Sequence, residues 1–185
     1  MTISRSLTLL ILCLTTIRPV HSAEKVDDMD FLSEWKSQSG GFVEETEIVK
    51  QGDGAARFLL FNGNYAVREG VPGDWSEFDA LSVWVYAEEA GEGVFGISVT
   101  TPKSPDEGWS YFYVKVPVDW EGWRQLIFHK EDFKGSRDPD WSNISNLQFA
   151  LMWNGWTVEV PDASVVIDDI ELLTPSDLES LEFGN

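Results

Sequence analysis

The sequence has little cysteine and little histidine, which limits the chemistry that the chain can perform. Cys13 is the one cysteine, and there are two histidines among 185 residues. A single cysteine forms neither an internal disulfide nor a thiolate metal cluster. The Gly-x-Ser-x-Gly, Glu-x-Asp-x-Glu and Gln-x-His motifs of hydrolases and lyases are also missing. We therefore predict a protein that is not an enzyme and that binds its ligand unchanged.

The chain also lacks an apolar run of the roughly 20 residues that a membrane-spanning helix needs. The run Leu7–Ile17 is shorter, follows the positive Arg5, and is followed by Val20-His21-Ser22. This pattern predicts a signal peptide over residues 1–22 that is cleaved before Ala23. We expect a secreted or periplasmic protein without a membrane span.

Positive charge is scarce, because 13 Lys and Arg residues stand against 32 Asp and Glu residues, a net charge of −19. Such a surface repels phosphates, sulfates and polyuronates, so nucleic acid is excluded and an uncharged partner is expected. Disorder is another source of acidity, but nine Trp and eleven Phe supply the aromatic surface of a packed core. We therefore expect a folded domain, acting as a monomer.

No sustained helical period follows the signal segment. Short runs rich in Val, Ile, Phe, Tyr and Trp alternate with turn residues, which predicts strands. The predicted strands are Glu47–Lys50, Ala56–Phe61, Ala80–Tyr86, Val94–Thr100, Trp109–Val118, Trp123–His129, Leu147–Trp153 and Ser164–Leu173. They predict an all-β fold, a β-sandwich or jelly roll of two antiparallel sheets, over residues 23–173. Residues 174–185 are expected to be a partly disordered tail, with a short helix over Ser176–Leu181 as the alternative.

Alternation assigns faces to two of these strands. Leu81, Val83 and Val85 share one side of their strand and are predicted to lie in the core. In the strand from Trp109, the tyrosines Tyr111 and Tyr113 fall on one face and Phe112 on the other. The tyrosines are predicted to lie on the more solvent-exposed face of the strand.

Four sequence segments together resemble one kind of protein module. They are Asp74-Trp75-Ser76-x-Phe78-Asp79-Ala80-Leu81, Gly122-Trp123-Arg124-Gln125-Leu126, Asp140-Trp141-x-x-Ile144-x-x-Leu147 and Val166-Ile167-Asp168-Asp169-Ile170-x-Leu172. Their order and spacing resemble carbohydrate-binding modules with the galactose-binding-like jelly roll, especially those similar to family 11. The resemblance covers roughly residues 28–173 and consists of hydrophobic framework, so it implies the fold more than the ligand. The aromatic residues of this framework are predicted core anchors: Trp75, Phe78, Trp123, Phe133 and Trp141.

The resemblance also implies a structural calcium ion that joins the start of the domain to its last strand. The matching carboxylates are Asp28 or Asp30 and Asp168 or Asp169, with carbonyl oxygens of Lys50–Asp53 completing the shell. Adjacent Asp168 and Asp169 point to opposite sides of a regular strand, so one of them is expected to face inward and to need a partner. The alternatives are that both lie at a sheet edge in water or that one meets Arg57.

A sugar receptor needs exposed aromatic rings beside hydrogen-bonding side chains. The predicted ligand-binding residues are Trp84, Tyr86, Tyr111, Tyr113, Trp153 and Trp156, with Gln148 and Arg57 as polar neighbours. The predicted function is that of a secreted, non-catalytic module that binds a neutral polysaccharide or oligosaccharide. The alternatives are a structural or protein-interaction jelly-roll domain, such as an envelope accessory or assembly factor, and a small glycan-active enzyme.

Overall fold

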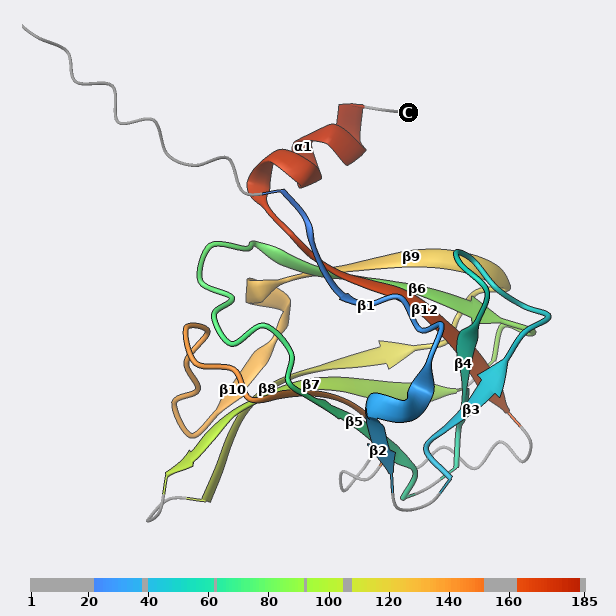
Figure 1. The fold of residues 1–185 in the computed structure, drawn as a ribbon, viewed down its shortest axis with the longest axis horizontal. Helices are drawn as coiled ribbons and strands as arrows, with labels where there is room; N and C mark the ends of the chain where they lie inside the picture. The colour runs from blue at the N-terminus through green and yellow to red at the C-terminus, as the bar shows by residue number, and fades with distance from the viewer. Residues whose placement is uncertain are drawn as a thin grey trace, which may run out of the picture.

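The protein is a sandwich of two antiparallel sheets, seen edge-on in Figure 1. The structure is a computed structural model that describes residues 22–37, 40–61, 63–91, 93–104, 108–151 and 163–183. Each sheet has six strands. The predicted all-β sandwich is therefore confirmed.

Sheet A is built around the long final strand, β12 (Ser164–Leu173), which pairs with β6 along its whole length. The strand order is β3-β4-β12-β6-β9, and β1 pairs with the end of β12 beyond β4. The other strands are β1 (Glu24–Asp27), β3 (Phe42–Glu45), β4 (Ala55–Leu59), β6 (Ala80–Ala87) and β9 (Gly122–His129).

Sheet B contains the two longest neighbouring strands, β7 (Val94–Ser104) and β8 (Gly108–Pro117). Its order is β10-β8-β7-β11-β5-β2, and all the pairings are antiparallel. The remaining strands are β2 (Trp35–Ser37), β5 (Tyr65–Glu69), β10 (Lys134–Ser136) and β11 (Asn146–Ala150).

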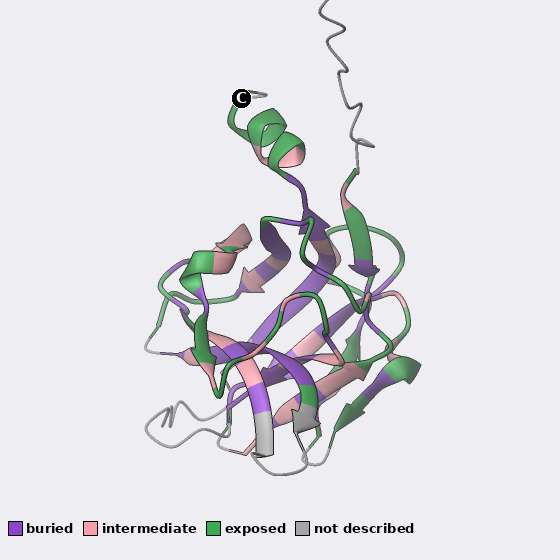
Figure 2. Ribbon diagram, turned by 90° about the vertical axis from the view of Figure 1, so that its left-hand side faces the viewer, coloured by how far each residue is buried: buried purple, intermediate pink, exposed green. Residues whose placement is uncertain are grey.

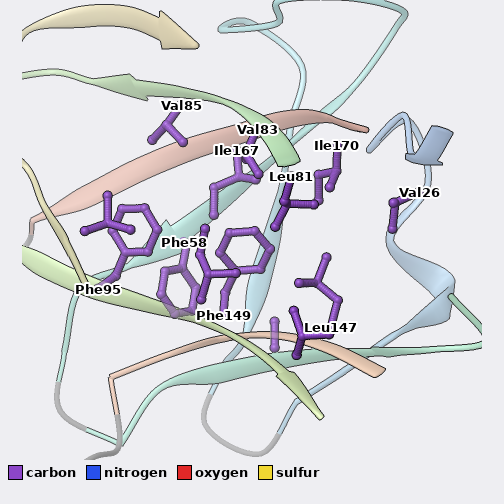
Figure 3. Close-up of a cluster of buried hydrophobic side chains, with 14 of the residues drawn as sticks. Val26, Phe58, Leu81, Val83, Val85, Phe95, Leu147, Phe149, Ile167 and Ile170 are labelled. Carbon is purple, nitrogen blue, oxygen red and sulfur yellow. The ribbon is translucent and has the colours of Figure 1, made fainter. Parts of the chain in front are cut away.

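The core lies between the sheets, where alternate residues of each strand meet. Phe58, Phe95 and Phe149 are fully buried there, with ring centroids 6.2 to 6.4 Å apart (Figure 3). Leu81, Val83 and Val85 point into the same layer, as predicted (Figure 3). The alternation that predicted these strands therefore also predicted which side of β6 is buried.

Helical structure is short and peripheral. There are two 3-10 turns, η1 (Leu32–Glu34) and η2 (Lys130–Asp132), and one helix, α1 (Pro175–Phe183). Thr174 caps α1, because its Oγ1 accepts the backbone N–H of Asp177 at 3.4 Å while its own N–H donates to Asp177 Oδ2 at 2.9 Å. None of the helix residues is buried (Figure 2). The described helices are all too short, or too polar, to cross a bilayer.

Two local predictions were wrong. Glu47–Lys50 is not a strand, because Glu45 Oε1 accepts the backbone N–H groups of Glu47 and Ile48 and holds the chain in a turn. Trp123 is not a core anchor: it lies on the outer face of sheet A, with its ring 5.5 Å from that of Tyr86. Trp75, Phe78 and Phe133 are buried as predicted, and the half-buried Trp141 packs against the core.

Candidate functional site

The predicted ligand-binding residues that the structure describes divide between the two outer faces of the sandwich. Those on sheet B are Tyr111, Tyr113 and Gln148, and together with Tyr65 and Ser98 they form what we call the tyrosine face. Those on sheet A form what we call the paired face, around Arg57, Trp84, Tyr86 and Asp168. No single ligand site contains the whole predicted set.

The tyrosine face follows from alternation in β8. Phe112 and Val116 face the core and are buried, so Tyr111 and Tyr113 must face outward, where they are half-buried. Their ring centroids lie 5.9 Å apart with the planes tilted by 54°. The two rings therefore form an adjacent pair on the outside of the sheet.

Strand register places polar side chains beside these rings. Tyr113 lies opposite Ser98 of β7, and Ser98 lies opposite Gln148 of β11. The Ser98 hydroxyl donates to Gln148 Oε1 at 3.5 Å. Ser98 is only 1% exposed and Thr100 only 7%, although both point away from the core. Their neighbours on β8 and β11 thus cover much of β7, and hydroxyl and amide groups lie next to aromatic rings.

Sequence reasoning missed Tyr65 as a member of this face. Ala150 of β11 pairs with Tyr65 of β5, so Tyr65 shares the outer side with Gln148 two residues along. The sequence signal was the alternation in the segment Tyr65–Glu69. Ala66 and Arg68 lie on one side of this strand, and Tyr65, Val67 and Glu69 lie on the outward side. The segment was overlooked because Ala, Arg and Glu weaken its strand composition.

On the paired face, protein contacts already engage the predicted ligand residues. Lys50 Nζ lies 3.8 Å from the centroid of the Trp84 ring, and Tyr86 meets the edge of Trp123. Arg57 Nη1 donates to Glu88 Oε1 and to the Ser164 hydroxyl, at 2.9 and 2.8 Å.

Arg57 also donates through Nη2 to Glu45 Oε2 at 2.5 Å. The pKa of Glu45 is lowered to about 2, mainly by the hydrogen bond from Glu47 N–H, against the effect of burial and with the help of Arg57. Arg57 is therefore a structural ion-pair residue on this face. The two remaining predicted aromatics, Trp153 and Trp156, lie outside the described residues.

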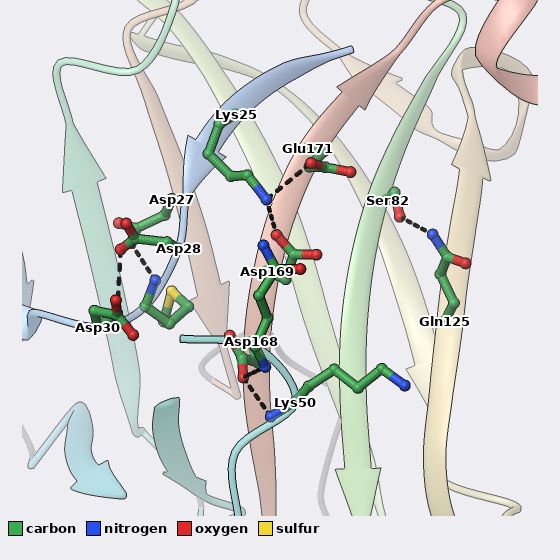
Figure 4. Close-up of polar contacts among 12 residues, drawn as sticks. Lys25, Asp27, Asp28, Asp30, Lys50, Ser82, Gln125, Asp168, Asp169 and Glu171 are labelled. Atoms are coloured by element: carbon green, nitrogen blue, oxygen red, sulfur yellow. Dashed lines mark hydrogen bonds and ion pairs between the residues drawn. The ribbon is translucent and has the colours of Figure 1, made fainter. Parts of the chain in front are cut away.

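The four carboxylates matched to calcium are used in different ways (Figure 4). Asp30 Oδ1 accepts the N–H groups of Asp53 and Gly54 at 2.8 and 2.9 Å, and the exposed Asp28 accepts the N–H of Asp30. Asp168 Oδ2 accepts the N–H groups of Lys50 and Gln51. The loop expected to supply carbonyl oxygens thus presents amide hydrogens to Asp30 and Asp168.

The carboxylate of Asp169 is held by the ammonium group of Lys25. A β-bulge with φ of 49° at Asp169 directs its carboxylate to Lys25 Nζ of β1, which also lies 2.8 Å from Glu171 Oε1 (Figure 4). Burial alone would lower the pKa of Lys25, but hydrogen bonds to these carboxylates outweigh it, and the pKa is raised. The bulge also means that neither acid is forced into the core, contrary to the expectation for a regular strand.

Asp168 is the carboxylate that best fits a cation. It is fully buried, and its Oδ1 has no hydrogen-bond partner in the structure. Burial raises the pKa of its carboxyl group, although N–H donors from Lys50 and Gln51 oppose this. Within the described ranges, however, no three His, Cys, Asp or Glu side chains gather as a metal site would require. The fit to calcium is therefore limited to one oxygen of Asp168.

Asp27, which sequence reasoning did not single out, is the buried acid of the first strand. Its carboxylate accepts from Trp35 Nε1 at 2.9 Å and from Met29 N–H at 2.7 Å, and it lies 2.6 Å from Arg68 Nη1. Burial raises the pKa of Asp27 against these contacts. The residue ties β1 to β2 and β5, and so has a structural role.

Comparison with known proteins adds solved structures of the same fold. No model of a protein family and no curated protein matches the sequence. The family 11 carbohydrate-binding module of cellulosomal cellulase Lic26A-Cel5E of Clostridium thermocellum aligns with a TM-score of 0.61 and 18% identity, over 83% of this chain and 95% of that one.

Two further structures of modules from Clostridium thermocellum align in the same way. A family 11 module in complex with a beta-1,3-1,4-mixed-linked tetrasaccharide has a TM-score of 0.59 and 18% identity, covering 82% and 95% of the two chains. The family 30 module of cellulosomal cellulase Cel9D-Cel44B has a TM-score of 0.52 and 14% identity, covering 83% and 91%. The chain thus has the jelly-roll fold of carbohydrate-binding modules, and the resemblance to family 11 is confirmed at the level of fold.

Proposed function

We propose that this domain binds a glycan, without transforming it, on the tyrosine face. The observation that carries the proposal is the pair Tyr111 and Tyr113, which stand side by side next to Ser98 and Gln148. The apolar face of a pyranose ring packs on an aromatic ring, while its hydroxyls pair with amide and hydroxyl groups. The fold shared with carbohydrate-binding modules supports the same function.

A non-catalytic role agrees with the groups on this face. Glycoside hydrolysis commonly uses two carboxylates on either side of the bond. Among the described outward residues of sheet B, the one carboxylate is Glu69, which forms an ion pair with Lys36. His129 lies on the other sheet, at the exposed end of β9. The proposed domain therefore holds a glycan rather than cleaving it.

Export and ligand charge remain predictions from the sequence. The signal segment 1–21 lies outside the described residues, and a secreted or periplasmic location rests on its composition. The net charge of −19 favours a neutral glycan at long range. A structural calcium ion at Asp168 is proposed on its unpartnered Oδ1.

Affinity electrophoresis against a panel of neutral and acidic polysaccharides tests the proposal. We expect retardation by at least one glycan and a loss of affinity of about tenfold or more in Tyr113→Ala, because a stacking ring is removed. Trp84→Ala is the matched control, since it removes an aromatic ring from the paired face. Equal losses in both variants, or retardation by no glycan, would contradict the proposal and favour the protein-interaction alternative.

A further inference from the structure

Charge is distributed unevenly over this acidic chain. None of the four neighbouring strands β10, β8, β7 and β11 contains an aspartate or a glutamate. These strands form most of the tyrosine face. In a chain with 32 acidic residues, 29 residues of contiguous sheet without one is a marked local departure from the average.

The charged residues of these strands are three lysines, and two of them adjoin Tyr113. Lys134 of β10 is directly opposite Tyr113, and Lys115 is two residues along β8 on the same outward side. Both side chains are exposed. Since directly opposite residues have Cβ atoms about 5 Å apart, a sugar ring stacked on Tyr113 lies within reach of the Lys134 ammonium group.

The acids of sheet A lie on the other side of the sandwich. Three of them, Asp168, Asp169 and Glu171, belong to β12. Lys25 forms ion pairs with Asp169 and Glu171. At physiological ionic strength the Debye length is about 8 Å, so charges across the sandwich act weakly on a ligand at Tyr113. The lysines beside Tyr113 therefore act on a ligand there more strongly than the acids of sheet A do.

We infer that the tyrosine face prefers a glycan that carries carboxylate or sulfate groups over its uncharged counterpart. The inference rests on the proposed function and replaces the neutral ligand that the net charge alone predicts. A group at the rim of the sugar ring meets Lys134 or Lys115, while the ring itself stacks on Tyr113.

Calorimetric titration of the full chain with pairs of polymers that share a backbone, one neutral and one anionic, tests this preference. Hydroxyethyl cellulose against carboxymethyl cellulose isolates the carboxylate, and dextran against dextran sulfate isolates the sulfate. We expect at least one anionic polymer to bind about fivefold or more tightly than its neutral partner, the size expected of an exposed charge pair. Equal or tighter binding of the neutral polymers would overturn the inference while leaving the proposed function intact.

Charge-matched variants identify the face responsible. Lys134→Gln and Lys115→Gln should each weaken binding of the preferred anionic polymer about three- to fivefold and leave neutral polymers unaffected. Arg124→Gln, which removes an exposed positive charge on β9 of the other sheet, is the control and should change neither. An equal effect of Arg124→Gln would show a net-charge effect and overturn the inference. Failure of every polymer to bind would instead contradict the proposed function.

Discussion

The two outer faces of the sandwich contain similar residues but use them differently. Both carry aromatic rings next to polar side chains, yet on the paired face Lys50 covers Trp84 and Arg57 is bonded to three partners. On the tyrosine face the rings lie beside small polar groups. The comparison teaches that composition does not distinguish the proposed ligand surface from a structural one, because the loop and the ion pairs that occupy the paired face come from distant parts of the chain.

The largest expected effect concerns the stability of the paired face. Arg57→Ala removes the partner of Glu45, whose side chain is only 10% exposed, and leaves a largely buried carboxylate without its cation. We expect the free energy of unfolding to fall by about 3 kcal/mol. Chemical denaturation measures this. Lys134→Ala on the tyrosine face is the control and should cost less than about 0.5 kcal/mol; similar losses in both would erase the contrast between the faces.

The second prediction concerns pH. Because the pKa of Glu45 is lowered from 4.5 to about 2, its contribution is present above pH 4.5 and is lost as the pH falls towards 2. The Arg57→Ala variant lacks part of this contribution. We therefore expect the difference in unfolding free energy between the wild type and this variant to shrink by at most about 2 kcal/mol between pH 5 and pH 2.

Asp27 and Asp168 change the stability with pH in the opposite direction to Glu45. Comparing the wild type with Arg57→Ala at each pH cancels their contribution, because both proteins contain these two residues. Their pKa values are raised by burial, so they favour folding at low pH in both proteins. Denaturation curves at several pH values provide the measurement. A difference that is constant over this range would mean that Arg57 does not act through the charge of Glu45.

The smallest expected effect concerns calcium at Asp168. A single free carboxylate oxygen makes a weak calcium site, since affinity depends on the number of charged ligands. We expect EDTA to lower the Tm of the wild type by about 3 °C, the change that somewhat less than 1 kcal/mol produces in a domain of this size. Asp168→Asn should show no response to EDTA. An unchanged midpoint in the wild type would argue against calcium.

Local patterns predicted the parts of the fold that depend on neighbours in sequence. The alternation of Leu81, Val83 and Val85 identified the buried side of β6, and the same rule placed Tyr111 and Tyr113 outside. The three-residue strands β2 and β10 went unnoticed because so few residues show no period. Their existence depends on pairing with β5 and β8, which lie 30 and 23 residues or so away along the chain.

The candidate site was less predictable than the fold. Each aromatic residue could be assigned to a side of its own strand, but the sequence does not tell which strands share a sheet. Trp84 and Tyr113 therefore looked equivalent, although they lie on opposite sides of the molecule. The pairing of Asp169 with Lys25, 144 residues away, is likewise a consequence of tertiary structure.

The bulge at Asp169 takes up one extra residue in the last strand. Ile167 and Ile170 both face the core, which a regular strand with two residues between them does not allow. A regular strand of the same length, without the bulge, would turn Ile170 and Leu172 towards solvent and Glu171 towards the interior. Deleting Asp169 would instead leave a regular strand in which Ile170 and Leu172 still face the core, at the loss of the ion pair with Lys25.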